Sequence, residues 1–247
     1  QACPAARLGP EAWARTQRGV EATRGAWADT RGVGPLEEVA EGPGRSPWLD
    51  PEWGARTARL LHPGRALDAA PLPRRGRGEA VADRDTTHLS VVDGEGNAVA
   101  LTGSLGRTWG SCHVTPGLGF PYNAFLEGFD LDDPSSSLFL RPGAGSRTMV
   151  APTILLRDGR AELVLGASGS SRIPAAVVNA VVSFVDRGLP VAEAVAAPRA
   201  VWSEGRNNRG MRVELAPPLL PEDADLLRAI GYPDLEAYAP ELEVTNF

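Results

Sequence analysis

The sequence predicts a mixed α/β protein in which β-hairpins alternate with helices. Two pairs of strand-like runs carry this prediction, because each pair is joined by a short turn that contains Gly: HLSVVD with AVALTGSL, and PTILL with AELVLG. A helix is predicted over residues 173–187, with Pro174 in its first turn and Gly188 after its end. Its apolar face is expected to consist of Val177, Val178, Val181 and Val185.

Further helices and strands are predicted before and after this central part. Residues 10–30 show an amphipathic pattern with Trp13, Val20 and Trp27 at heptad spacing, and a second short helix is predicted after Asp50. Toward the C-terminus the pattern predicts a short helix in PVAEAVAAP, a strand in RVELA, a helix in PEDADLLRAIGY and a strand in ELEVTNF.

The composition is that of a soluble globular protein, with 43% hydrophobic and 23% charged residues in a chain of 247. The formal net charge of −6 argues against a nucleic acid partner, because binding to phosphates needs a concentrated cationic face. All 25 basic residues are Arg, which excludes a P-loop lysine, a Schiff-base lysine and a Ser–Lys dyad. No run is long and apolar enough for a membrane span, and no signal-peptide pattern is visible.

The usual signatures of metal and cofactor sites are missing from the sequence. Cys3 and Cys112 lack metal-ligand spacing and form no disulfide framework, and His62, His88 and His113 are scattered. The run GASGS lacks the last glycine of a hydrolase nucleophile elbow, and no GxGxxG occurs. Neither a cofactor nor a metal is therefore expected.

One junction in the chain could carry nucleophilic chemistry. Residues 66–84 are rich in Pro, Gly, Arg and Asp, which predicts an exposed linker, and Asp85 and Thr86 follow it directly. A Thr that becomes an N-terminus is a strong nucleophile, because its α-amine, with a pKa of about 7.7 to 8, accepts the hydroxyl proton near neutral pH. The alternative is that Thr86 and Thr87 are simply two β-branched residues that open a strand.

The residues from Asp85 onward resemble a known family. DTTHLSVVDGEGNAVALTGSL is similar to the start of the small subunit of gamma-glutamyltranspeptidases, whose precursors cleave themselves before a Thr-Thr-His run. Three later runs also resemble segments of the small subunit: WGSCHVTPGLGFPYN, MVAPTILLRDGRAELVLG and GASGSSRI. Two earlier runs resemble the end of the large subunit: GVEATRGAWADTRG and LDPEWGARTARLLHPGRA. The sequence is therefore identified as a divergent member of this family of N-terminal-nucleophile hydrolases.

The resemblance implies the four-layer αββα sandwich of that superfamily. We expect the sandwich to be incomplete in this chain, and the chain alone to be inactive and marginally stable, because the front of the large subunit and the last strands of the small subunit are not matched. Residues 1–85 would be the end of the large-subunit-like region with its linker, and residues 86–247 the small-subunit-like catalytic region. The two segments would pair after self-cleavage between Asp85 and Thr86. A periplasmic or secreted location is suggested by the family alone.

The resemblance also implies catalytic roles. Thr86 matches the nucleophile, and Ser104 stands where the family has a Thr whose hydroxyl orients that nucleophile. Gly169 and Ser170 match two glycines whose backbone amides form the oxyanion hole, and a Ser still offers its amide. Thr87 matches the threonine beside the nucleophile and is expected to help bind the substrate. The expected reaction is acyl transfer from a small-molecule gamma-glutamyl or related amide to water or an amine, without a cofactor.

Several positions that bind the donor amino acid in typical members differ here. These positions are occupied by Gly106, Glu127, Gly128, Thr148 and Met149. Arg107 either takes over recognition of a carboxylate or is an ordinary surface arginine. The segment from 129 to 147 is short, as in members without a lid loop. Glutathione is therefore expected to be a poor substrate. The alternatives are an acylase with a non-glutamyl substrate and an inactive truncated homologue.

Overall fold

The computed structural model describes most of the chain from Thr86 onward. The described residues are Glu52, Ala55, Arg59, 86–136, 138–146, 148–169, 172–197, 199–203, 210–214, 221–229, Tyr232 and 234–238. The helix predicted over residues 10–30, the linker and the final ELEVTNF run lie outside them, as do Asp85 and Ser170. Glu52, Ala55 and Arg59 are helical, which agrees with the short helix predicted after Asp50.

The described residues belong to two compact units. We call them the hairpin unit, within residues 86–178, and the C-terminal unit, which contains the described residues within 179–238 and also Glu52, Ala55 and Arg59. The division predicted between residues 85 and 86 is a cleavage point between two subunit-like regions, not a boundary between compact units. It stays a prediction.

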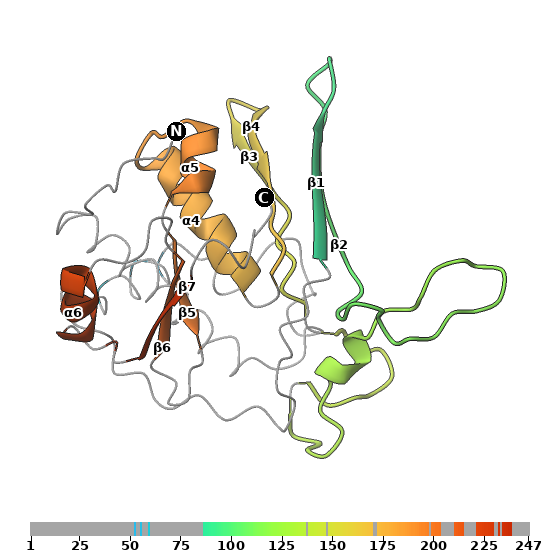
Figure 1. The fold of residues 1–247 in the computed structure, drawn as a ribbon. Helices are drawn as coiled ribbons and strands as arrows, with labels where there is room; N and C mark the ends of the chain where they lie inside the picture. The colour runs from blue at the N-terminus through green and yellow to red at the C-terminus, as the bar shows by residue number, and fades with distance from the viewer. Residues whose placement is uncertain are drawn as a thin grey trace. The chain divides into compact units, whose positions relative to one another are not determined.

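The hairpin unit begins with the first predicted hairpin (Figure 1). β1 (Thr86–Val92) and β2 (Ala98–Ser104) pair antiparallel, with Thr86 directly opposite Ser104. Because side chains alternate along a strand, Thr86 and Ser104 share one face of the hairpin. The other face carries the exposed aliphatic side chains Leu89, Val91, Val99 and Leu101.

The turn of this hairpin is closed by Asp93. One oxygen of its carboxylate accepts the backbone amides of Glu95 and Asn97 at 2.9 and 2.8 Å, and the other accepts the Asn97 side chain at 2.7 Å. The Asn97 side chain and these amides hold the pKa of Asp93 below its usual value. Such side-chain caps are the reason that Asp is frequent in turns.

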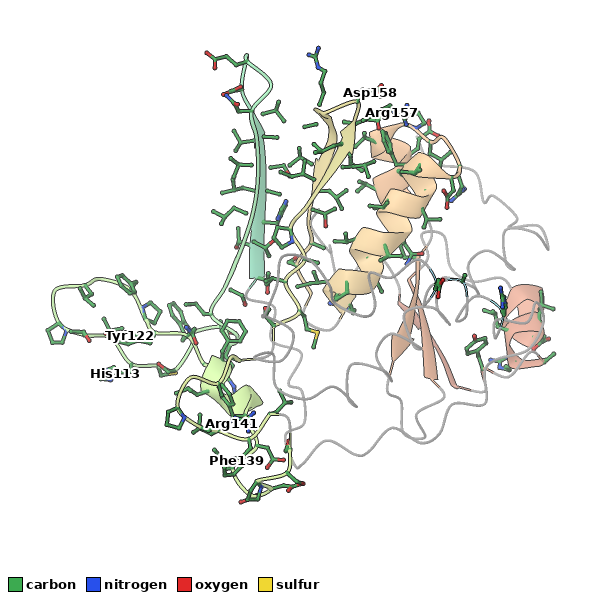
Figure 2. The ribbon with its side chains drawn as sticks, turned by 180° about the vertical axis from the view of Figure 1, so that it is seen from behind. His113, Tyr122, Phe139, Arg141, Arg157 and Asp158 are labelled. Atoms are coloured by element: carbon green, nitrogen blue, oxygen red, sulfur yellow. The ribbon has the colours of Figure 1, made fainter. Side chains whose placement is uncertain are left out.

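The second predicted hairpin is also confirmed. β3 (Thr153–Arg157) and β4 (Arg160–Leu165) pair antiparallel across a two-residue turn formed by Asp158 and Gly159 (Figures 1 and 2). Both turn residues have positive φ, 52° and 77°, as the tight turns of β-hairpins require. In β4 the side chains of Leu163 and Leu165 are buried, so this strand carries the core of the unit.

Helix α4 (Ile173–Val185) occupies the predicted place, but its buried stripe differs from the expected one. Val177 is buried, whereas Val178 and Val185 are exposed. The buried residues of the helix are instead Ile173, Ala175, Ala176, Val177, Ala180 and Ser183. Alanine side chains are small and are buried where a helix packs closely against its neighbours. In a helix rich in Ala and Val, the positions of the larger valines therefore do not identify the buried face.

A long loop connects the two hairpins, and part of it forms a protruding arm, residues 109–122. Its backbone is held by hydrogen bonds from the Ser111 amide to the Tyr122 carbonyl, at 2.8 Å, and from the Tyr122 amide to the His113 carbonyl, at 2.9 Å. The rings of His113 and Tyr122 stack with centroids 5.7 Å apart (Figure 2). After the arm comes a short 3-10 helix, η2 (Phe125–Gly128).

The C-terminal unit contains a three-stranded sheet of order β5-β6-β7. After α5 (Val191–Ala196), β5 (Arg199–Ser203) pairs antiparallel with β6 (Gly210–Glu214). Helix α6 (Pro221–Ala229) then returns the chain so that β7 (Asp234–Tyr238) lies parallel to β6. A helical crossover is the usual way to join parallel strands.

Of these elements α5, β6 and α6 are predicted from the sequence, whereas η2, β5 and β7 are not. Both β5 and β7 are short. β7 also pairs in parallel with β6, and no local turn signal in the sequence predicts such a pairing. Among the described residues, no helix is long and apolar enough to cross a membrane.

We expect Gly110→Ala to destabilise the protein more than Gly117→Ala does. Both glycines have positive φ, 56° and 88°, which costs about 1 kcal/mol or more for Ala. A methyl group on Gly110 would also overlap the Tyr122 carbonyl, whereas one on Gly117 meets nothing. Denaturant unfolding of the two variants measures the difference, and equal losses would contradict this account of the arm.

Candidate active site

Thr86, the predicted nucleophile, lies at the start of β1 and is half-buried. Its Oγ1 donates a hydrogen bond to the Oγ of Ser104 at 3.1 Å. The contact follows from the strand pairing, because two residues directly opposite each other in an antiparallel pair carry their Cβ atoms about 5 Å apart. The structure thus brings together the two side chains that the sequence pairs as nucleophile and orienting hydroxyl.

Ser104 is itself fixed by the residues that follow it. Its Oγ accepts the backbone amide of Gly106 at 3.0 Å. Gly106 has a φ of +81°, in the region where glycine is favoured, so the chain turns sharply after β2. The Leu105 carbonyl accepts the Ala124 amide at 2.8 Å, which ties this turn to the chain before η2.

A cavity of about 300 Å³ opens beside this turn. Arg107 and Glu127 lie on its wall and form an ion pair, with Nη2 and Oε2 2.6 Å apart. Each side chain is about half exposed, so water screens the pair and the net stabilisation is small. The residues that line the cavity are Arg107, Thr108, Trp109, Gly110, Ser111, Cys112 and Glu127.

The remaining predicted donor-binding residues lie apart from this wall. Thr148 is exposed, and its Oγ1 accepts the Val150 amide at 3.2 Å, just before β3. Met149 is half-buried, and Thr87 is exposed on the opposite face of β1 from Thr86. None of these three side chains lines the cavity beside Arg107.

The predicted oxyanion segment follows β4 as a buried elbow. Gly166, Ala167 and Gly169 are buried, and Gly169 has a φ of 119°, which side-chain-bearing residues rarely adopt. The Gly169 carbonyl accepts hydrogen bonds from the backbone amide and the Nε of Arg172, at 3.2 and 3.3 Å. This carbonyl is thereby held toward the start of α4.

Two contacts align β1 with β4 and with the elbow. The Ser90 hydroxyl donates to the Val164 carbonyl at 3.1 Å. The His88 ring lies against Gly166 so closely that a methyl group on that glycine would overlap it. His88, two residues before Ser90 on β1, thus contacts the residue two positions after Val164, which is the first residue of the elbow.

His88 belongs to this site, although sequence reasoning assigns it no role. Its Nδ1 is 2.8 Å from the Thr102 Oγ1, and its Nε2 is 3.0 Å from the Ser90 Oγ. Partial burial lowers the pKa of His88, so its neutral form is favoured. The alternation of the strand was the available signal, because it puts His88 on the same face as Thr86. Within the described part of the chain, no group of His, Cys, Asp or Glu could hold a metal ion.

The sequence matches the family model described as Gamma-glutamyltranspeptidase over residues 4–233. The Acylase ACY 1 proenzyme of Pseudomonas sp. (strain V22) is 38% identical over 121 residues, which is 49% of this chain and 21% of that protein. The Glutathione hydrolase proenzyme of Escherichia coli is 36% identical over 135 residues, 51% of this chain and 23% of that protein. The chain thus spans about a fifth to a quarter of the length of these relatives.

Solved structures are similar as well. A gamma-glutamyltranspeptidase from Pseudomonas nitroreducens matches with a TM-score of 0.54 and 33% identity, over 61% of this chain and 82% of that one. A cephalosporin acylase from Bacillus halodurans matches with a TM-score of 0.69 over 94% of this chain and 39% of that one; at 21% identity, this likeness concerns the fold alone. The match of the family model to nearly the whole sequence shows that the chain belongs to the gamma-glutamyltranspeptidase family.

Proposed function

We propose that this protein is a self-processing amidase of the gamma-glutamyltransferase type, in which Thr86 is the nucleophile. The observation that carries the proposal is the hydrogen bond of 3.1 Å between Thr86 Oγ1 and Ser104 Oγ. A hydroxyl with a fixed neighbour at the start of a strand has a defined direction of attack, which catalysis by an N-terminal nucleophile requires.

In the first step the Thr86 hydroxyl attacks the carbonyl carbon of Asp85. The peptide C–N bond breaks as an ester to Oγ1 forms, and the α-amine of Thr86 takes up the hydroxyl proton. Water then hydrolyses the ester, which frees the hydroxyl and leaves Thr86 as an N-terminus. The relatives that are described as proenzymes support a step of this kind. The segments before and after the cut would stay together as two subunits.

In the second step the freed amine accepts the hydroxyl proton while Oγ1 attacks the amide of a small-molecule substrate. Backbone amides of Gly169 and Ser170 would stabilise the oxyanion; this proposal is supported by the contact of His88, two residues after Thr86 on β1, with Gly166 at the start of the elbow. The leaving amine takes the proton, and water or another amine then removes the acyl group from Thr86. None of these residues needs a cofactor for this reaction.

The cavity lined by Arg107 and Glu127 would hold the acyl donor. Its two charges are opposite and already paired, so a donor carboxylate that binds Arg107 competes with Glu127 for the guanidinium. Within the cavity wall no further charged side chain is present. This arrangement favours a donor other than a simple glutamyl group, and it supports the second candidate function, an acylase, to which the similarity to an acylase proenzyme also points.

We expect Thr86→Ala to abolish self-cleavage, because Ala has no nucleophilic oxygen. Intact-mass analysis of the full-length protein should show one chain for this variant and two chains, separated between Asp85 and Thr86, for the natural sequence. Thr86→Ser, which keeps the oxygen, is the control and should still be cut. A natural protein that stays uncut, or is cut elsewhere, would refute the proposed mechanism.

We expect Ser104→Ala to lower kcat by about tenfold, because one positioned hydrogen bond contributes roughly 1 to 1.5 kcal/mol. Ser104→Thr keeps a hydroxyl at this position and should retain most of the activity. Steady-state kinetics of the processed enzyme separates the two variants. An unchanged kcat in Ser104→Ala would mean that the hydroxyl does not orient Thr86.

We expect Glu127→Gln to lower the KM of donors that carry a carboxylate by about three- to tenfold, because Arg107 is then free to bind them. Donors without a carboxylate should be unaffected, and Arg107→Gln is the control that removes the effect. A panel of glutathione, gamma-glutamyl anilides and uncharged acyl anilides measures this, with glutathione expected to be poor. A rise in KM for glutamyl donors would show that Glu127 binds the donor amine.

A further inference from the structure

We propose that His88 is a positioning residue that fixes β1 against β4 and so sets where Thr86 stands relative to the elbow of residues 166–169. The inference rests on the proposed function, because it concerns the same nucleophile. His88 is not part of the cavity wall, and its effect on the reaction is indirect.

The hydrogen bonds around His88 define its protonation state. The Ser90 hydroxyl donates its only hydrogen to the Val164 carbonyl. In the contact with His88 its oxygen therefore accepts a hydrogen bond from Nε2–H. Nε2 is then protonated, and in a neutral ring Nδ1 is the acceptor for the Thr102 hydroxyl. The result is one continuous chain from Thr102 through His88 and Ser90 to the backbone of β4.

This chain joins three strands at once. Thr102 lies on β2 directly opposite His88, Ser90 lies on β1, and Val164 lies on β4. The ring therefore connects the hairpin that carries Thr86 to the strand that leads into the elbow. Partial burial favours the neutral ring, which is the form that can accept from Thr102 and donate to Ser90 together.

Gly166 adds a packing contact to these hydrogen bonds. We call the ring with its contacts to Thr102, Ser90 and Gly166 the His88 clamp. The absence of a side chain at this position lets the first residue of the elbow lie in contact with His88. The ring thus determines both the spacing of β1 and β4, through contact with Gly166, and their alignment, through Ser90. A shift of 1 Å between a nucleophile and its oxyanion donors can reduce a rate about a hundredfold.

The test compares matched variants of the processed full-length enzyme. Ser90→Ala breaks the link to Val164 and Thr102→Val removes the donor to Nδ1, whereas Ser90→Thr and Thr102→Ser keep the hydroxyls. His88→Phe fills the space without polar atoms. We expect kcat to fall about tenfold in Ser90→Ala and Thr102→Val and about a hundredfold in His88→Phe, with KM nearly unchanged.

A double variant shows whether Ser90 acts through the ring. His88→Phe with Ser90→Ala should lose less activity than the two single losses multiplied together, because residues of one hydrogen-bonded chain are not additive. If His88, Ser90 and Thr102 only stabilised the fold, their variants would lower the unfolding midpoint and leave kcat of the folded enzyme unchanged. That result would overturn the inference. So would additive losses, or a change in KM alone.

A measurement that needs no activity keeps the inference separate from the proposed function. In the uncleaved Thr86→Ala protein, ¹⁵N NMR of the imidazole should report a neutral His88 with its proton on Nε2 near pH 7. A proton on Nδ1, or a charged ring, would overturn the clamp. The two proposals can fail separately. If Thr86→Ala is cut and active after all, the proposed function fails, whereas the clamp stands as long as His88 is neutral with its proton on Nε2.

Discussion

The pairing register of β1 with β2 is the constraint on which the rest of the site depends. With Thr86 opposite Ser104, the side chains of His88, Ser90 and Thr102 fall on the same face as Thr86; the other face carries the aliphatic side chains Leu89, Val91, Val99 and Leu101. A slip of one residue would turn Thr86 away from Ser104 and bring the aliphatic side chains into its place. The Asp93 turn holds the register at the far end, because its carboxylate fixes the number of residues in the loop.

Local sequence signals predicted the parts of the fold that local chemistry determines. The Asp158–Gly159 turn and the glycine after α4 are examples, since positive φ at those points limits the residues that fit. The pairing of Thr86 with Ser104 was within reach as well, because hairpin length and side-chain alternation fix it. The strands β5 and β7 were not, because β7 gains its place only by pairing with β6 across a helix.

The parts of the site that sequence reasoning missed are contacts between segments that no pattern connects. From the sequence, Arg107 is either a carboxylate-binding residue or a surface arginine, whereas the structure pairs it with Glu127 in the 3-10 helix η2. Spacing alone says only that His88 lacks metal-ligand neighbours, whereas its partners are two hydroxyls and a glycine. Features shared by hydrolases and acylases of the family are expected on the strands, and the differences in the loops, where function varies most readily.

The contact between His88 and Gly166 restricts how this site can change during evolution. Any side chain at position 166 overlaps the imidazole, so a residue larger than glycine fits there only if the ring at position 88 moves or is replaced. The two positions are therefore expected to covary among homologous sequences, and replacing the histidine first avoids the overlap. The path also passes through an intermediate that has lost the ring but not yet filled the space, and such a protein carries a void between two strands.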